Sequence, residues 1–135
     1  MSTEPLSEQV VALLRLPNPA VMATVAADGR PVTVATWYLY EDDGRILLNL
    51  DGRRARLKHL RKDPRVSLTV LAGDNWYTHV SLQGRIDKLT DDEDLADIDA
   101  LSRAYTGNPY PNRDYPRVSG RLVVERWHVW GDLSD

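Results

Sequence analysis

The sequence predicts an α+β fold in which a small six-stranded antiparallel β-barrel carries peripheral helices. Six segments are rich in Val, Ile, Thr, Trp and Tyr, the composition typical of strands, and turn residues separate most of them. The helical segments are short, and long helices do not alternate with strands as they do in a doubly wound sheet. A chain of 135 residues with this pattern favours a small barrel.

The N-terminal half is predicted to form a helix followed by an antiparallel meander. Thr3 can cap a helix that has Pro5 in its first turn, and Pro17 ends the helical spacing of apolar residues. The next three segments are expected to be strands, at residues 20–27, 31–40 and 45–50. Asp28-Gly29 is a strong hairpin signal between the first two strands.

The C-terminal half is predicted to add two helices and three strands. In chain order these are a helix, two strands, a helix and a strand, at residues 54–62, 65–71, 76–89, 90–105 and 118–130. Gly84 is expected to kink or bulge the long strand. Thr90 and Glu93 form a capping box that is expected to open the last helix. Residues 107–116 contain three prolines and are expected to be an irregular loop.

The composition indicates a single domain over residues 1–135. A hydrophobic content of 42% is enough for one core, and the absence of cysteine excludes disulfides, thiolate nucleophiles and Cys-based zinc sites. The three histidines are scattered, so no metal site is expected. The first residues lack the features of a secretion signal, and the apolar runs are far shorter than the roughly 18 residues of a membrane span. We therefore expect a cytoplasmic protein with no membrane partner.

The positive charge is concentrated in one segment. Seven of the 17 basic side chains lie between Arg53 and Arg65, so this segment carries +6 while the rest of the chain carries −9. Such a local cluster indicates a bound phosphate more than a general affinity for polyanions, and no nucleic-acid partner is expected from a chain of net charge −3. The alternative for this segment is an ordinary solvated helix face.

Several motifs resemble those of a known family. They are residues 23–25 (Ala-Thr-Val), 28–31 (Asp-Gly-Arg-Pro), 37–38 (Trp-Tyr) and 54–67, the basic segment that contains Asp-Pro-Arg. With residues 118–131, they resemble the pyridoxamine 5'-phosphate oxidase-like split barrels that bind FMN. Within this superfamily the Arg-x-Arg-x-Lys series and Asn75-Trp76 are similar to the actinobacterial branch that uses the deazaflavin coenzyme F420.

The resemblance implies a homodimer with two cofactor sites at the subunit interface. The cofactor phosphate is expected at Arg54, Arg56 and Lys58; helical spacing places Arg54 and Lys58 on one face and Arg56 on another. The resemblance also implies a wall for the cofactor ring, made by Val32, Thr33, Val34, Asn49, Leu50, Trp76 and Tyr77. Ordinary sheet packing is the alternative for each aromatic residue taken alone.

The implied activity is hydride transfer from reduced F420 to a small unsaturated or conjugated acceptor. The accompanying proton is expected from solvent or from His79, which shares a strand face with Tyr77; His79 is otherwise an ordinary sheet residue. The alternatives are an FMN-dependent oxidoreductase on the same scaffold, a non-catalytic protein that binds a flavin, deazaflavin or tetrapyrrole, and an RNA-binding protein that uses the basic helix. The expected partners are the acceptor and a second copy of the chain.

Overall fold

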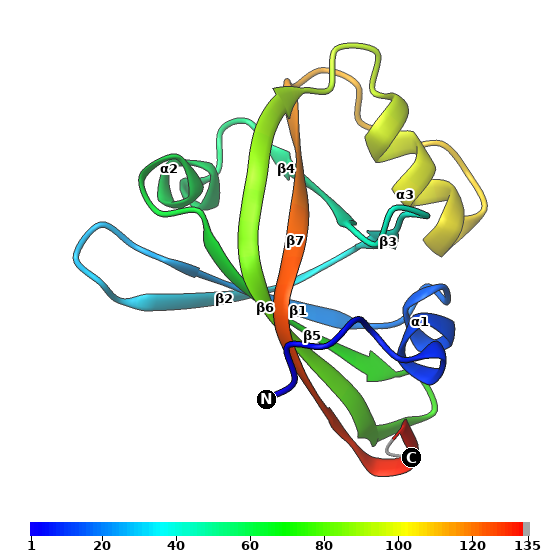
Figure 1. Ribbon diagram of the computed structural model, residues 1–135. Helices are drawn as coiled ribbons and strands as arrows, with labels where there is room; N and C mark the ends of the chain where they lie inside the picture. The colour runs from blue at the N-terminus through cyan, green and yellow to red at the C-terminus, as the bar shows by residue number, and fades with distance from the viewer. Residues whose placement is uncertain (134–135) are drawn as a thin grey trace.

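The computed structural model describes residues 1–133 and contains one antiparallel sheet of seven strands and three helices (Figure 1). The strands are β1 (Ala20–Val25), β2 (Pro31–Thr36), β3 (Leu39–Tyr40), β4 (Ile46–Asp51), β5 (Arg65–Ala72), β6 (Asn75–Asp91) and β7 (Arg117–Trp130). The helices are α1 (Glu8–Leu14), α2 (Ala55–Lys62) and α3 (Ala96–Thr106), and a short 3-10 turn, η1, covers Gly131–Leu133. The α+β split-barrel prediction is confirmed.

The two edge strands of the sheet are consecutive in the sequence. The strand order is β2-β1-β5-β6-β7-β4-β3, and only Trp37 and Tyr38 separate the end of β2 from the start of β3. The sheet must therefore curl until its edges are close, although no ladder joins β2 to β3 within residues 1–133. The strand predicted at residues 31–40 is thus two strands, which raises the count from six to seven.

Tyr38 fixes this junction. Its side chain is 1% exposed, and its hydroxyl donates to the carbonyl of Leu16 at 2.6 Å, in the turn that follows α1. The Tyr105 hydroxyl of α3 donates to the carbonyl of Asn18 at 2.7 Å in the same turn. Both tyrosines therefore hold the turn between α1 and β1 against the junction of the two edge strands.

The apolar interior consists of inward-facing side chains from the strands together with one face of α1. Its fully buried members include Val10, Ile46, Leu48, Leu50, Leu68, Val70, Val80, Leu82 and Leu122. In β1 and β5 the burial alternates along the strand, as expected when one sheet face covers the core. No helix within residues 1–133 has both the length and the hydropathy of a membrane span.

Two helix starts differ from the sequence prediction. Helix α1 begins at Glu8 with Ser7 as its cap rather than at Thr3, because Ser2 pairs with Trp127 in an isolated bridge that keeps the first residues extended. The capping box at Thr90 and Glu93 is also wrong, since β6 continues to pair with β7 as far as Asp91. The Asp92 carboxylate instead accepts from the backbone amides of Asp97 and Ile98, at 3.1 and 2.9 Å.

Gly84 lies at a bulge in the long ribbon formed by β6 and β7, which crosses the whole molecule in Figure 1. The register shifts between Gln83 and Gly84, which confirms the expected bulge. A Cβ at position 84 would overlap the carbonyl oxygen of Val123, a backbone atom of the paired strand. Glycine is therefore required here by the close approach of two backbones.

We expect Gly84→Ala to lower the free energy of unfolding by roughly 3 kcal/mol or more, because the overlap can be relieved only by moving strand backbone. Urea unfolding followed by intrinsic Trp fluorescence measures this change. Gly73→Ala is the matched control, since a Cβ there meets its nearest atom, Asn18 Oδ1, at an ordinary 3.5 Å. Equal losses in the two variants would contradict the proposed role of the bulge.

Candidate functional site

A groove of about 690 Å³ lies where the barrel is split. One side comes from β1 and β2 through Val21, Ala35 and Thr36, and the other side comes from α3, β4 and β7. Its remaining lining residues include two prolines, Pro17 and Pro19, and residues considered below: Trp37, Asn49, Arg56, Tyr105, Tyr110 and Arg117. We call this space the split groove, because it occupies the gap between the edges that the sheet leaves unpaired.

Three aromatic side chains form one wall of the split groove. Trp37 stacks on Tyr105 with ring centroids 5.4 Å apart, and Tyr110 meets Trp37 edge-on at 6.1 Å. Burial raises the pKa of Tyr105, so its hydroxyl stays protonated while it donates to the carbonyl of Asn18. The wall is therefore an aromatic surface against which a planar ring can pack.

The other end of the split groove is cationic. Arg56 extends from α2 into the groove, half-buried, with Nη1 3.9 Å from the sulfur of Met22. Burial, and then the nearby charges of Arg54 and Arg117, lower the pKa of Arg56. No carboxylate forms an ion pair with Arg56 or Arg117 within residues 1–133. This end of the groove is suited to an anionic group.

The structure divides the seven basic residues of the 53–65 segment into two kinds. Arg53 and Arg65 each hold an aspartate two residues before them, Asp51 and Asp63, with closest contacts of 2.7 Å. The other five make no ion pair with a described residue: Arg54, Arg56, Lys58, Arg61 and Lys62. The charge available to a ligand is therefore that of the predicted phosphate-binding residues, Arg54, Arg56 and Lys58. Arg61 and Lys62, at the end of α2, add to it.

The N-terminus of α2 adds backbone donors to this charge. Arg54 occupies the N-cap position with an extended backbone, and its side chain makes no capping hydrogen bond. Arg54 and Lys58 are exposed, whereas Arg56 is half-buried on another side of the helix, as the spacing predicted. Free amide groups at a helix start attract anions, so the start of α2 offers backbone donors to a phosphate.

The residues predicted to line the ring site lie in two separate regions of one chain. Val32, Thr33 and Val34 belong to the edge strand β2, where alternate residues direct backbone N–H and C=O groups away from β1. The side chain of Leu50 is fully buried in the core, so only its backbone is available to a ligand. Asn49 lines the split groove and is 7% exposed.

Trp76, Tyr77 and His79 lie at the distant end of β6. Arg85 of β6 pairs with Arg65, which directly follows α2. Tyr77 lies eight residues from Arg85 along β6, a separation of roughly 26 Å. Trp76 and Tyr77 stack at 4.2 Å and are 62% and 60% exposed. His79 Nδ1 lies 3.1 Å from the carbonyls of both, which places the ring proton on Nδ1. One chain therefore does not bring these residues to the split groove, and their ligand roles stay predictions.

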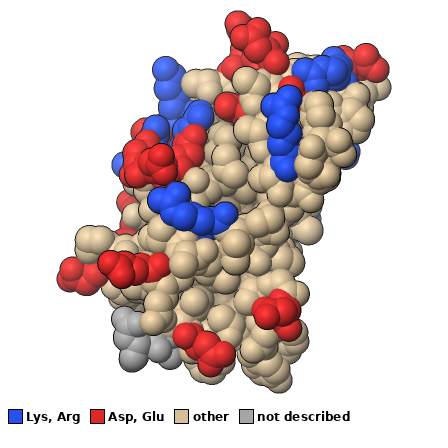
Figure 2. All heavy atoms as spheres, turned by 90° about the vertical axis from the view of Figure 1, so that its right-hand side faces the viewer, with Lys and Arg blue, Asp and Glu red and all other residues tan. Residues whose placement is uncertain are grey.

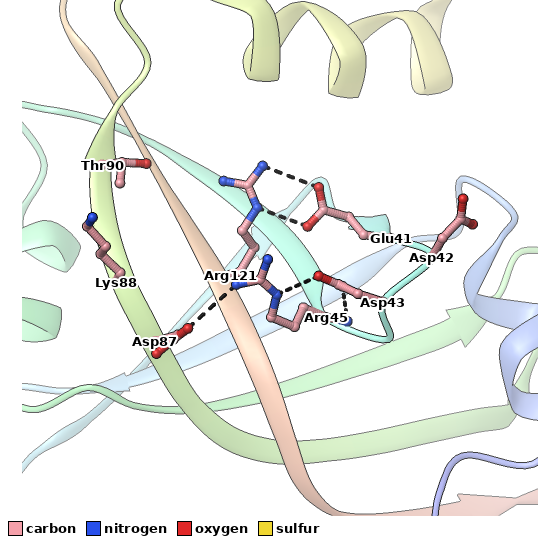
Figure 3. Close-up of a pocket in the computed structure, with 8 residues that line it drawn as sticks. All are labelled: Glu41, Asp42, Asp43, Arg45, Asp87, Lys88, Thr90 and Arg121. Carbon is pink, nitrogen blue, oxygen red and sulfur yellow. Dashed lines mark hydrogen bonds and ion pairs between the residues drawn. The ribbon is translucent and has the colours of Figure 1, made fainter.

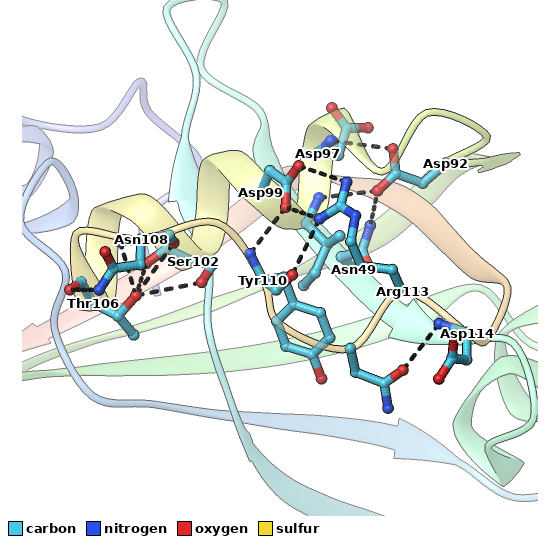
Figure 4. Close-up of polar contacts among 12 residues, drawn as sticks. Asn49, Asp92, Asp97, Asp99, Ser102, Thr106, Asn108, Tyr110, Arg113 and Asp114 are labelled. Carbon is cyan, nitrogen blue, oxygen red and sulfur yellow. Dashed lines mark hydrogen bonds and ion pairs between the residues drawn. The ribbon is translucent and has the colours of Figure 1, made fainter.

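The loop at residues 107–116 contributes Tyr110 to the split groove, and polar contacts hold the loop against α3 (Figure 4). Asp99 of α3 accepts from Arg113 Nη1 and Nη2 at 2.9 and 3.1 Å and from the amide of Tyr110 at 2.9 Å. The Arg113 guanidinium, followed by that amide, holds the pKa of the Asp99 carboxyl below its usual range. Further along, Arg53 lies 3.3 Å from the ring centroid of Tyr115. These contacts fix Tyr110 in the groove wall.

Asn49 connects the cationic end of the split groove to α3. Its amide nitrogen donates to Asp92 at 3.1 Å and to Ser119 at 3.0 Å, and its oxygen accepts from Arg117 Nε at 2.6 Å. Arg117 did not emerge as a site residue from the sequence. Only the pairing of β4 with β7, which sets Asp51 opposite Arg117, could have indicated it, and that register is not readable from local patterns.

A second hollow differs from the split groove because carboxylates form ion pairs with its arginines (Figure 3). It measures about 370 Å³, but its arginines already hold carboxylates. Arg121 binds Glu41 at 2.9 and 3.2 Å, and Arg45 binds Asp43 at 2.9 Å. Figure 2 likewise shows basic and acidic side chains interleaved over the upper part of one face. The split groove therefore differs from this second hollow in that its arginines make no ion pair with a described residue.

Comparisons with known proteins agree with the fold. The family model for pyridoxamine 5'-phosphate oxidase matches residues 6–131. The structure is similar to an F420 reductase, with a TM-score of 0.83, 23% identity, and coverage of 91% of this chain and 98% of that one. It is also similar to a conserved hypothetical protein from Mycobacterium tuberculosis, with a TM-score of 0.74, 28% identity, and coverage of 96% and 88%.

A third similar structure is a heme binding protein from Mycobacterium smegmatis. The TM-score is 0.63 at 22% identity, and the match covers 92% of this chain but 54% of that one. At this level of identity the likeness concerns the fold alone. An F420 reductase and a heme binding protein thus share this scaffold, so the ligand of the groove must be inferred from the residues that line it.

The tyrosines beside the groove make stability sensitive to alkaline pH. Burial raises the pKa of Tyr38 from 10.0 to about 12. The stabilisation this represents, about 2 to 3 kcal/mol, is complete below the unfolded value near 10 and is lost as the pH rises through about 12. We expect the free energy of unfolding to fall steeply over this interval in urea titrations.

Tyr38→Phe removes the ionising group, so its unfolding free energy should fall less steeply above pH 10, although it loses the bond to Leu16 at neutral pH. The same slope in Tyr38→Phe as in the wild type would contradict the assignment.

Proposed function

The chain belongs to the pyridoxamine 5'-phosphate oxidase family, and from this membership we propose that it is an oxidoreductase that uses coenzyme F420 to reduce a small conjugated acceptor. The family and the structural likeness to an F420 reductase support the coarser assignment to the flavin and deazaflavin oxidoreductases. The choice of F420 and of the acceptor class is our proposal.

One observation carries the proposal: the cations of α2 make no ion pair with a described residue, and one of them, Arg56, lines a groove that has an aromatic wall. Arg54 and Lys58 lie exposed beside the uncapped start of α2, and Arg56 extends from the same helix into the split groove. A cofactor with a planar ring and a phosphate tail needs these two environments side by side. A tail that carries further carboxylates also suits several exposed cations better than a single clamp.

The chemistry assigned to the protein is binding and orientation. When bound, F420 supplies the hydride, and the chain supplies no covalent nucleophile. The outward backbone groups of β2 can hydrogen-bond the edge of a planar ring, and Arg54 and Lys58 can anchor its phosphate. The aromatic wall excludes water from one side of the groove. Together these contacts would hold the ring against an acceptor.

We also propose that the complete site needs a second copy of the chain. Trp76 and Tyr77 are exposed at one end of β6, while α2 and the split groove lie elsewhere. Trp130, paired with His79 on β7, is 56% exposed at the same end as Trp76. In a homodimer these aromatics, and His79 as a candidate proton donor, could approach the groove of the partner subunit, which accounts for their exposure.

The competing candidate is an FMN-dependent enzyme on the same scaffold, which would use the same basic residues. Titration of the purified protein with oxidised F420 and with FMN, followed by intrinsic Trp fluorescence, distinguishes the two. We expect saturable binding with preference for F420, and reduction of conjugated acceptors by the reduced cofactor. Preference for FMN would overturn the cofactor choice, and binding without any acceptor reduced would favour a carrier.

Replacing Arg54 and Lys58 by alanine together should weaken F420 binding by more than tenfold, because each loses a charge-assisted contact to phosphate. The melting temperature should change little, since neither side chain forms an ion pair with a described residue. The matched control is Arg61→Ala with Lys62→Ala, which removes the same charge from the other end of α2. Equal weakening by both pairs would indicate a diffuse field rather than a phosphate site.

A further inference from the structure

Four arginines of the described chain are half-buried, and they fall into two pairs. Arg45 and Arg121 are bound to carboxylates, with shortest contacts of 2.9 Å to Asp43 and Glu41. Arg56 and Arg117 have no ion-pair partner within residues 1–133, and both line the split groove. Partly buried guanidinium groups are normally paired, so these two indicate a site that a ligand completes.

Arg117 is held in a fixed orientation. Its Nε donates to Asn49 Oδ1 at 2.6 Å, and its guanidinium lies 4.9 Å from the ring centroid of Tyr110. Asn49 cannot turn its amide over, because its nitrogen already donates to the Asp92 carboxylate and to Ser119. The Nη groups of Arg117 make no hydrogen bond to a described residue, so they remain available as donors.

The neighbouring carboxylates are already satisfied. Asp51, opposite Arg117 in the sheet, accepts from Arg53 Nη2 at 2.7 Å and from Arg53 Nε at 3.0 Å. Asp92 accepts from Asn49 and from two backbone amides. The repulsion between Arg56 and Arg117 is thus left for a ligand to relieve, and it contributes to the lowered pKa of Arg56.

We propose that Arg56 and Arg117 together bind one anionic group, a carboxylate or a phosphate, of a planar ligand that lies along the aromatic wall of the split groove. The fork of a guanidinium matches both oxyanions, and the two cations come from different elements, α2 and β7. The source of the anion rests on the proposed function: it belongs either to a carboxylate-bearing acceptor or to the cofactor tail. Arg117 is a binding residue, and Asn49 is its positioning residue.

The test uses full-length protein and calorimetric titration with 2-naphthoate and with its uncharged analogue, 2-naphthamide. The wild type should bind the carboxylate at least tenfold more tightly than the amide, and Arg117→Gln should remove about tenfold of that preference. Arg117→Lys should recover only part of it, because it restores the charge without the fork. Arg103→Gln, which removes an exposed charge from α3 outside the groove, should behave as the wild type.

F420 binding to Arg117→Gln identifies the source of the anion. Unchanged F420 affinity with weakened naphthoate binding assigns the site to the acceptor, whereas weakening of both, with competition between them, assigns it to the cofactor tail. If wild-type protein binds no F420, the proposed function fails, but a naphthoate preference that depends on Arg117 still supports the inference. Naphthoate and F420 binding that are both the same in Arg117→Gln as in the wild type would overturn it.

The positioning role of Asn49 has a separate readout. Asn49→Ala should weaken naphthoate binding less than Arg117→Gln does, and adding it to Arg117→Gln should cause no further loss, because Asn49 acts through Arg117. Additive losses would show that Asn49 contributes independently and would remove its positioning role. Melting temperatures measured for every variant separate loss of binding from loss of folded protein.

Discussion

The fold depends on the covalent link between the two edges of its sheet. Because β2 and β3 are separated by only Trp37 and Tyr38, the seven strands cannot lie as an open sheet, and the interior is enclosed without a final ladder. The two junction residues have opposite roles. Tyr38 is buried against the turn after α1, while Trp37 forms part of the groove wall. One dipeptide thus closes the core and shapes the site.

The arginines that stabilise the fold and those that line the split groove differ in whether a carboxylate pairs with them. Arginines that stabilise the fold form ion pairs with carboxylates, as Arg121 does with Glu41. The two charges of such a pair cancel, so no positive charge is left to attract a ligand. Around the split groove the nearby acids are already engaged: Asp51, although opposite Arg117 in the sheet, accepts from Arg53, and Asp92 accepts from Asn49. The sheet therefore keeps a local positive potential in a protein of net negative charge.

The sequence predicted the parts of the structure that local chemistry determines. The Asp28-Gly29 hairpin and the Gly84 bulge are set by backbone conformation or close packing at single residues, and the basic series is visible as composition. The predicted cap at Thr90 failed because pairing of β6 with β7 outcompeted it. Arg117 was missed because its position depends on strand register. Trp76 lies far from α2 because β6 is long, and the length of a strand cannot be read from short sequence motifs.

The loop at residues 107–116 differs from the rest of the groove in how it is attached. Sheet ladders position β1, β2 and β4, whereas the loop is held by side chains at few points, chiefly Asp99 with Arg113 and Arg53 with Tyr115. A lineage could therefore exchange this segment, and with it the shape presented by Tyr110, without altering strand pairing. Divergence in ligand preference among relatives should accumulate here first, while the cationic end stays constant.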